Sequence, residues 1–272
     1  MRTVKSFSRN ARGDYEVAIA GDDGVVAPFR LSEDLVVEYR LLPGRTLEEA
    51  DYRRLLSDAD ADGLYGAALR SIARAPRTSR EIRAFLAART EDPTLADRVY
   101  AKLLAKGYVD DLAYALAYVD YHFGTRRDGP VKLRFDLERK GVFRDYVEEA
   151  VSGLDSKAVA RNLACLFDRR LPQLSSRPRA KAVRAMKTHL LQRGYDPSVA
   201  IAYVDGRLAD FPAGEDEEKK AATDLVKARK RLSAKGIDGH ALRAKLIQAL
   251  MNKGYRYDTI RRVIDKEEDD ES

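Results

Sequence analysis

One short pattern occurs four times in this chain: a leucine, two variable residues, a basic residue, a glycine, and then Tyr or Val. A glycine after the last turn of a helix adopts the left-handed conformation, and a basic residue before it faces the negative helix end. The apolar residue after the glycine folds back onto the leucine. We therefore predict four helix C-caps, formed by the structural glycines Gly107, Gly141, Gly194 and Gly254.

The residues beyond three of these glycines are also alike. Val147, Ala200 and Ile260 each follow their glycine by six residues, and the three glycines are separated by 53 and 60 residues. Such a length holds three helices, and the uneven spacing argues against tetratricopeptide arrays, whose period is about 34 residues. The pattern predicts a mainly α-helical fold of tandem three-helix repeats, arranged as an elongated, curved array.

The composition suits small helical modules with much surface. Of the 272 residues, 44% are hydrophobic and 35% are charged, and the net charge of +6 permits binding to a polyanion. A single cysteine, Cys165, excludes an internal disulfide framework, fits a reducing compartment and is expected to be a buried, inert thiol. Apolar runs stay below the roughly 18 residues of a membrane span, and the N-terminus lacks a signal-type apolar region. We expect a cytoplasmic protein that does not bind membranes.

Strand-like runs are confined to the first 31 residues. They predict a small three-stranded meander with turns at 12–14 and 21–24, and its strands are Val4–Phe7, Tyr15–Ala20 and Val25–Leu31. A helix is predicted over 32–39, and a capping box at 46–49 predicts a second helix that ends near residue 57.

These signals divide the chain as follows. We predict a β-rich N-terminal extension over 1–45, a connecting helix over 46–62, three-helix repeats over 63–107, 108–152 and 153–212, a fourth helical repeat over 213–264, and an acidic tail over 265–272 that frays. A capping box at Thr78–Glu81 opens a helix of the first repeat. A break at 211–214 precedes the fourth.

Motifs for metal or nucleotide chemistry are incomplete. Asp58–Gly63 matches the opening of a calcium loop, but Leu69 stands where that loop needs a bidentate Glu, so an acidic turn that ends a helix is favoured. The chain has no phosphate loop, and its three histidines stand far apart without ligand spacing. We predict no cofactor, no metal and no enzymatic activity.

Two surface features remain open on the residues alone. Tyr114, Tyr118 and Tyr121 form one helical stripe, which could stack bases but is more often a core or a repeat interface. Basic residues recur every three or four positions over 177–187 and cluster again over 227–235. A solvated face and contact with a polyanion explain these basic runs equally well.

The middle of the chain resembles the RecX family, bacterial regulators of the RecA recombinase. The resemblance rests on the run from Leu103 to Ala115 (LLAKGYVDDLAYA), on Gly129-Pro130, and on Leu137 to Val142 (LERKGV). Arg77–Ile82 (RTSREI) is similar to an upstream helix of that family. The likeness covers about residues 64–260, although His122 stands where the family usually has an arginine.

The resemblance implies a non-enzymatic regulator. Such a protein would bind the RecA–single-stranded DNA filament and modulate its ATPase and strand exchange in recombination, DNA repair and the SOS response. We expect the chain itself to be a monomer. The alternative is a helical-repeat protein that binds nucleic acid without a recombinase. Combining the resemblance with helical spacing, we expect filament or DNA contacts from eight basic residues: Lys132, Arg134, Arg139, Lys140, Arg177, Lys181, Arg184 and Lys187.

Overall fold

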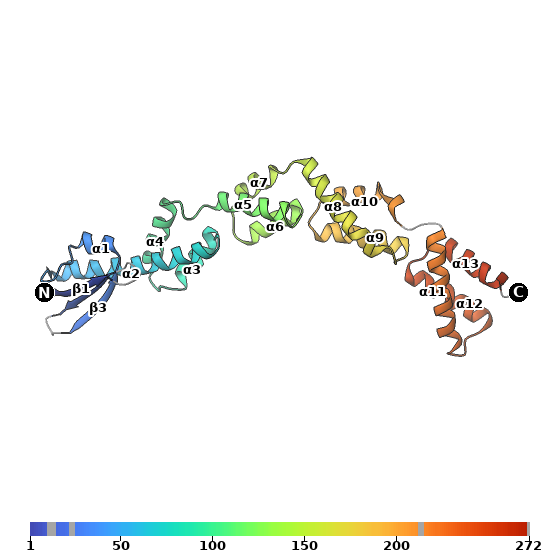
Figure 1. Ribbon diagram of the computed structural model, residues 1–272, viewed down its shortest axis with the longest axis horizontal. Coiled ribbons are helices and arrows are strands. Elements are labelled where there is room, and N and C mark those ends of the chain that lie inside the picture. Colours follow the sequence, from blue (N-terminus) through green and yellow to red (C-terminus); the bar gives the residue numbers. More distant parts are fainter. Residues whose placement is uncertain (10–14, 22–24, 212–214, 271–272) are drawn as a thin grey trace. The chain divides into compact units, whose positions relative to one another are not determined.

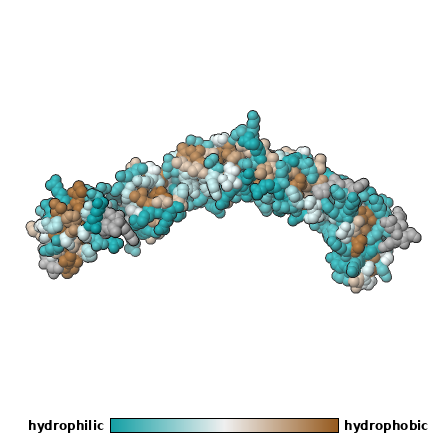
Figure 2. All heavy atoms as spheres, in the orientation of Figure 1, coloured by the Kyte–Doolittle hydropathy of each residue, from teal (hydrophilic) through white to brown (hydrophobic). Residues whose placement is uncertain are grey.

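The computed structural model describes residues 1–9, 15–21, 25–211 and 215–270. The described part is mainly helical, with thirteen α-helices and a four-stranded antiparallel sheet near the N-terminus (Figure 1). The chain divides into two compact units, one comprising Met1–Ala117 and Leu137–Glu148 and the other Tyr118–Asp136 and Glu149–Ser272. Polar side chains cover most of the face shown in Figure 2, as expected for a chain rich in charge.

The N-terminal sheet has one strand more than the sequence predicted. Its order is β3-β2-β1-β4, and the strands are β1 (Arg2–Arg9), β2 (Tyr15–Ala20), β3 (Val26–Leu31) and β4 (Thr46–Leu47). The expected capping box at 46–49 is wrong because Thr46 and Leu47 pair with β1, and Glu48 becomes the N-cap of the next helix without a side-chain bond. The predicted turns at 12–14 and 22–24 lie outside the described residues.

One long helix replaces the predicted connecting helix and its acidic turn. Helix α1 (Glu33–Glu38) leads to α2 (Glu49–Arg74), which continues straight through Asp58–Gly63. Tyr52 and Leu55, in the first half of α2, pack in the core of the sheet. Leu64 and Ala68, in its second half, pack in the core formed with α3 and α4, so tertiary contacts stabilise both halves of the helix.

The acidic middle of α2 is held by its neighbours and does not break the helix. Asp58 accepts hydrogen bonds from the Tyr39 hydroxyl at 2.6 Å and from Arg98 at 2.8 Å. Burial and the bond to Asp58 raise the pKa of Tyr39 to about 12. The helix-ending turn predicted here is therefore wrong.

Four helical groups run from the second half of α2 to the end of the described chain. The first continues from the end of α2 with α3 (Ser79–Ala87) and α4 (Pro93–Ala105), and the predicted capping box of Thr78 and Glu81 is confirmed. The other helices are α5 (Asp111–Gly124), α6 (Pro130–Arg139), α7 (Arg144–Ser152), α8 (Ser156–Leu174), α9 (Arg179–Gln192), α10 (Pro197–Asp205), α11 (Glu215–Ser233), α12 (Gly239–Lys253) and α13 (Tyr257–Asp270).

The C-terminal helices enclose two separate apolar cores. Helices α8, α9 and α10 surround Phe167, Met186 and Tyr195, while α11, α12 and α13 surround a core that includes Leu250 and Ile260. Each core lies within one helical trio, as expected for repeats that pack internally.

Two smaller expectations differ from the structure. Helix α13 continues to Asp270, past the predicted start of a frayed tail, because Arg243 pairs with both Asp265 and Glu268. Cys165 is half-buried, not enclosed. The predicted break at 211–214 falls largely on 212–214, outside the described residues.

Candidate functional site

The four repeated glycines all have the left-handed backbone that the sequence pattern demands. Their φ angles are +71° at Gly107, +82° at Gly141, +83° at Gly194 and +99° at Gly254. In each copy the amide after the glycine donates to the carbonyl of the leucine five residues earlier, at 3.0 to 3.3 Å. This bond closes the helix end and buries the following apolar residue in three copies, where it is Val142, Tyr195 or Tyr255.

Three of these caps have a second role, since each receives the start of another helix. The start of α6 lies against the end of α9: Gly129 N donates to Arg193 O at 2.6 Å, and Val131 N donates to Gly194 O at 3.0 Å. A Cβ on Gly194 would overlap the Cβ of Lys132. The unpaired amides of one helix thus satisfy the unpaired carbonyls of the other, and the two helix dipoles meet head to tail.

The same arrangement recurs twice with side chains as the link. At the start of α3, the Thr78 hydroxyl donates to Lys140 O at 3.0 Å, beside Gly141. At the start of α9, Lys181 Nζ donates to Asn252 O at 2.8 Å while its stem covers Gly254. We call these three contacts the α3/α6, α6/α9 and α9/α12 joints.

A buried carboxylate anchors the α6/α9 joint. Asp128 is 0% exposed and accepts from Lys132 Nζ at 2.9 Å, with Arg193 Nη2 at 3.4 Å and His122 Nδ1 at 3.2 Å. Burial alone would raise the pKa of Asp128, but the hydrogen bonds from Lys132 and His122 and the charge of Arg193 lower it overall. His122, which stands where the family usually has arginine, therefore still places a ring nitrogen beside this carboxylate.

Tyr195, the residue after the cap glycine, closes the same joint. Its hydroxyl donates to Arg127 O at 3.1 Å, and burial raises its pKa to about 12. The tyrosine thus stays neutral at physiological pH and remains a hydrogen-bond donor.

The tyrosine stripe on α5 is engaged with neighbouring side chains. Tyr118 stacks on His122 with ring centroids 3.9 Å apart, and Tyr121 meets the same ring edge-on at 5.4 Å. Tyr114 lies near Lys140, whose Nζ is 5.6 Å from the ring centroid, and a hydrogen bond to Tyr114 raises the pKa of Lys140.

The eight predicted contact residues do not form one surface. Lys132, Lys140 and Lys181 belong to the joints, and Lys187 Nζ pairs with Asp205 at 2.7 Å. The Arg139 carbonyl accepts from the Arg80 guanidinium in the α3/α6 joint. Arg134 is half-buried on α6.

Three of the eight do lie together, in a groove between α8 and α9. This α8/α9 groove encloses about 400 Å³, and the lining residues are Arg170, Arg177, Lys181, Arg184, Ala185, Thr188, His189 and Gln192. Carboxylates are absent from this lining, as far as the structure is described. Burial and the charges of Arg170 and Arg193 lower the pKa of His189, so it is neutral at neutral pH and the arginines and lysine set the charge.

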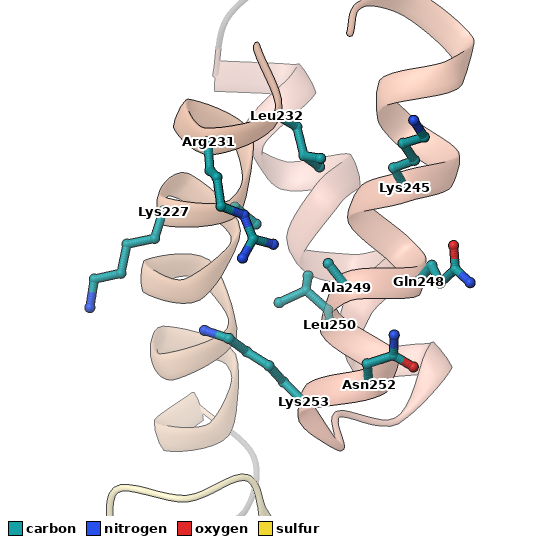
Figure 3. Close-up of a pocket in the computed structure, with 10 residues that line it drawn as sticks. Lys227, Arg231, Leu232, Lys245, Gln248, Ala249, Leu250, Asn252 and Lys253 are labelled. Carbon is teal, nitrogen blue, oxygen red and sulfur yellow. The ribbon is translucent and has the colours of Figure 1, made fainter. Parts of the chain in front are cut away.

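A second basic groove lies between α11 and α12 (Figure 3). This α11/α12 groove encloses about 680 Å³ and also lacks a carboxylate among its described lining residues. Its four cations are Lys227, Arg231, Lys245 and Lys253, and the half-buried apolar residues Leu232 and Ala249 lie between them. In Figure 3, Arg231 and Lys253 extend into the space between the two helices from opposite sides.

One of these four charges is neutralised close by. Lys253 Nζ pairs with Asp224 Oδ1 at 2.7 Å, and Asp224 also accepts from the Tyr255 hydroxyl at 3.0 Å. Burial would raise the pKa of Asp224, but the bonds from Lys253 and Tyr255 lower it. Lys227, Arg231 and Lys245 therefore dominate the charge of the groove.

The two grooves use the same four positions of their second helix. In both repeats, the residues that lie nine, six, five and two places before the cap glycine (Gly194 or Gly254) line the groove. They hold Ala185, Thr188, His189 and Gln192 in α9, and Lys245, Gln248, Ala249 and Asn252 in α12. Lys245 was not predicted from the sequence because it lies outside the runs of basic residues. Its place nine residues before the cap glycine Gly254, equivalent to that of Ala185 before Gly194, is the signal that identifies it as a groove residue.

Comparison with known proteins gives one consistent result. Family models for the second and third three-helix domains of RecX match residues 110–151 and 216–264. A protein named Regulatory protein RecX from Lactobacillus delbrueckii subsp. bulgaricus is 29% identical over 233 residues, covering 85% of this chain and 84% of that protein. Its counterpart from Bacillus pumilus is 27% identical over 242 residues, covering 88% and 90%. The chain belongs to the RecX family.

Solved RecX structures share the helical-repeat fold. One crystal structure of a regulatory protein RecX superposes with a TM-score of 0.61 at 20% identity, covering 76% of this chain and all of that one. RecX from Lactobacillus salivarius superposes with a TM-score of 0.51 at 22% identity, covering 55% and 97%. Family membership supports a regulatory role for this chain. A search of the described helices finds none that is long and apolar enough to cross a membrane.

Proposed function

We propose that this RecX family protein binds the filament that RecA recombinase forms on single-stranded DNA and modulates its ATPase and strand exchange. It acts as a cytoplasmic monomer in recombination, DNA repair and the SOS response, without catalysing a reaction itself. The observation that carries the proposal is the α8/α9 groove, in a chain whose family is regulatory. A groove with this charge attracts phosphates and acidic protein surfaces alike.

The joints support a polymer as the target. Each of the three joints fixes the start of one repeat's second helix on the cap of the next repeat's second helix. Within one compact unit, the last two repeats are linked in this way and each carries a basic groove, which suits a partner that is itself a repeating polymer. Many weak contacts along such a partner add up to a stable complex.

The clearest test removes charge from the groove without disturbing a joint. Arg177 and Arg184 are exposed and line the α8/α9 groove. Reversing both, as R177E/R184E, should reduce modulation of the recombinase ATPase because the variant associates more slowly and dissociates faster. Reversing two exposed cations of α8 outside the groove, as K157E/R161E, is the matched control and should retain modulation.

The alternative is a nucleic-acid-binding protein that acts without a recombinase. The α11/α12 groove favours this reading, because its cations could bind phosphates in the absence of any protein partner. Co-sedimentation distinguishes the two functions. The filament regulator sediments more completely with recombinase filaments than with the same DNA alone and alters ATP hydrolysis, whereas the alternative gains nothing from the recombinase.

A further inference from the structure

The two basic grooves meet at the α9/α12 joint. Lys181 lines the α8/α9 groove, and its ammonium group donates to the carbonyl of Asn252 at 2.8 Å. Asn252 in turn lines the α11/α12 groove. The grooves are thus adjacent sections of one surface, which we call the basic track, within one compact unit of the chain.

We propose that the basic track is a binding site for the phosphate backbone of one single strand of nucleic acid, used directly and without the recombinase. This inference deepens the function proposed above and rests on it for its biological setting, because the filament contains single-stranded DNA. It assigns nucleic-acid contact to the last two repeats.

The lining of the track fits a strand in its charge. Lys227, Arg231 and Lys245 supply positive charge, and the half-buried Leu232 and Ala249 lie beside them. In single-strand sites cations follow the backbone, and aromatic side chains often stack on the bases. The described lining of the track has no Phe, Tyr or Trp, so we expect the strand to be held through its phosphates. The lining contains no carboxylate among the described residues, so these cations are available to successive phosphates of an extended strand.

The neighbouring repeat lacks this character at the same positions. Counted back from Gly141, positions 9, 6, 5 and 2 hold Lys132, Phe135, Asp136 and Arg139. Phe135 stands where α9 and α12 have polar residues, and Asp136 brings a negative charge to a position that is neutral in both. Lys132 is hydrogen-bonded to Asp128. The alignment of the repeats therefore predicts that the track is confined to the last two repeats and does not extend onto α6.

The salt dependence of binding measures the number of phosphates held. For single strands, the slope of log K against log salt is about −0.7 per phosphate contact. Within the described part of the chain, five cations of the track form no salt bridge and belong to no joint: Arg177, Arg184, Lys227, Arg231 and Lys245. If each holds one phosphate, the expected slope is about −3.5.

The experiment uses the full chain and a fluorescent oligothymidine, with anisotropy titrations at several salt concentrations. The triple variant K227Q/R231Q/K245Q should lose affinity and should shrink the slope by about 2, while R177Q/R184Q should shrink it by about 1.4. The matched control K230Q/K235Q/R256Q removes three exposed charges of the same repeat outside the track and should keep the slope. Circular dichroism checks that every variant is folded.

Three results would overturn the inference. The first is an absence of oligothymidine binding at about 50 mM salt, where phosphate contacts are strong. The second is an unchanged slope for both groove variants. The third is a triple variant that loses binding to filaments but binds the bare strand normally, which would assign the track to an acidic protein surface. A wild-type chain that binds the strand but leaves the recombinase ATPase unaltered would instead refute the proposed function alone.

Discussion

The α6/α9 and α9/α12 joints begin from the same sequence pattern and are built differently. At α6/α9, backbone meets backbone through Gly129 and Gly194, over a fully buried Asp128. At α9/α12, the exposed side chain of Lys181 lies across Gly254, and the start of α9 is held further by the Arg179 amide, which donates to Glu217 of α11 at 3.2 Å. The cap glycine is equivalent in both joints, so the partner helix determines how firmly each joint is held.

The residues that start each partner helix explain the difference. Helix α6 is preceded by Gly129, where a Cβ would overlap the carbonyl of Gly194, so only glycine permits this approach. Helix α9 is preceded by Pro178, which has no amide hydrogen to donate. The link to the end of α12 is made instead by the side chain of Lys181, which donates to the carbonyl of Asn252. We infer that α6/α9 is the stiffer joint.

The largest effect is expected from Gly194→Ala. The new Cβ must adopt the left-handed backbone and also displace the backbone of Lys132, so the variant should lose about 3 kcal/mol of unfolding free energy. Urea unfolding followed by circular dichroism measures the loss.

Gly107→Ala is the matched control for that variant. Gly107 also has a positive φ, but a Cβ there meets nothing within 4 Å, so only the strain of about 1 kcal/mol is expected. Equal losses in the two variants would show that the α6/α9 contact contributes little.

The second effect is expected from Asp128→Asn, which leaves three basic groups beside a neutral amide. Breaking a buried ion cluster in this way should cost about 2 to 3 kcal/mol. Asp224→Asn is the comparison, because Asp224 is partly exposed and has one basic partner at hydrogen-bond distance. A larger loss at Asp224 would reverse the ranking of the two regions.

The same carboxylate makes the α6/α9 joint sensitive to acid. The pKa of Asp128 in the folded state lies below its usual 3.8, so its contribution is complete above about pH 3.8 and is lost as pH falls through the lower folded-state value. The stability gap between wild type and Asp128→Asn should therefore be full at pH 7 and should narrow at pH 3. A gap that widens in acid would contradict an ionised Asp128.

The third effect in size is expected from Gly254→Ala. Its Cβ would stand 2.7 Å from Lys181 Cγ, and a flexible side chain can move away from it. The cost should therefore stay near the backbone strain, about 1 to 2 kcal/mol, and clearly below that of Gly194→Ala. Parallel urea curves give the comparison, and a loss as large as that at Gly194 would show that both joints are equally rigid.

The four helix caps could be predicted from the sequence, whereas the joints between repeats could not. The repeated pattern carries its own geometry, since a glycine after a basic residue and before an apolar one specifies a local turn. The joints depend on contacts such as Gly129 with Arg193, 64 residues apart, which no local pattern encodes. Helix α2 shows the converse: Asp58–Gly63 is locally helix-breaking, and its tertiary partners Tyr39 and Arg98 override that preference.

The basic grooves were predictable only in part, for a related reason. Helical spacing identified Arg177, Lys181 and Arg184, which share one groove. It also selected Lys187, which faces Asp205, because spacing along a helix does not reveal what the next helix presents. Lys245 was missed, since Lys227 and Arg231, which share its groove, lie on another helix.

The smallest effect is expected from Lys181→Met. Methionine keeps an apolar stem over Gly254 and removes only the hydrogen bond to the Asn252 carbonyl, which is partly open to water. We expect a loss of about 0.5 to 1 kcal/mol, visible as a small drop in the urea midpoint. The matched variant Lys132→Met removes the partner of a buried carboxylate and should cost more. If Lys181→Met costs as much as Lys132→Met, the side-chain link of α9/α12 is as strong as the buried cluster of α6/α9, and the difference between the joints does not extend to their stability.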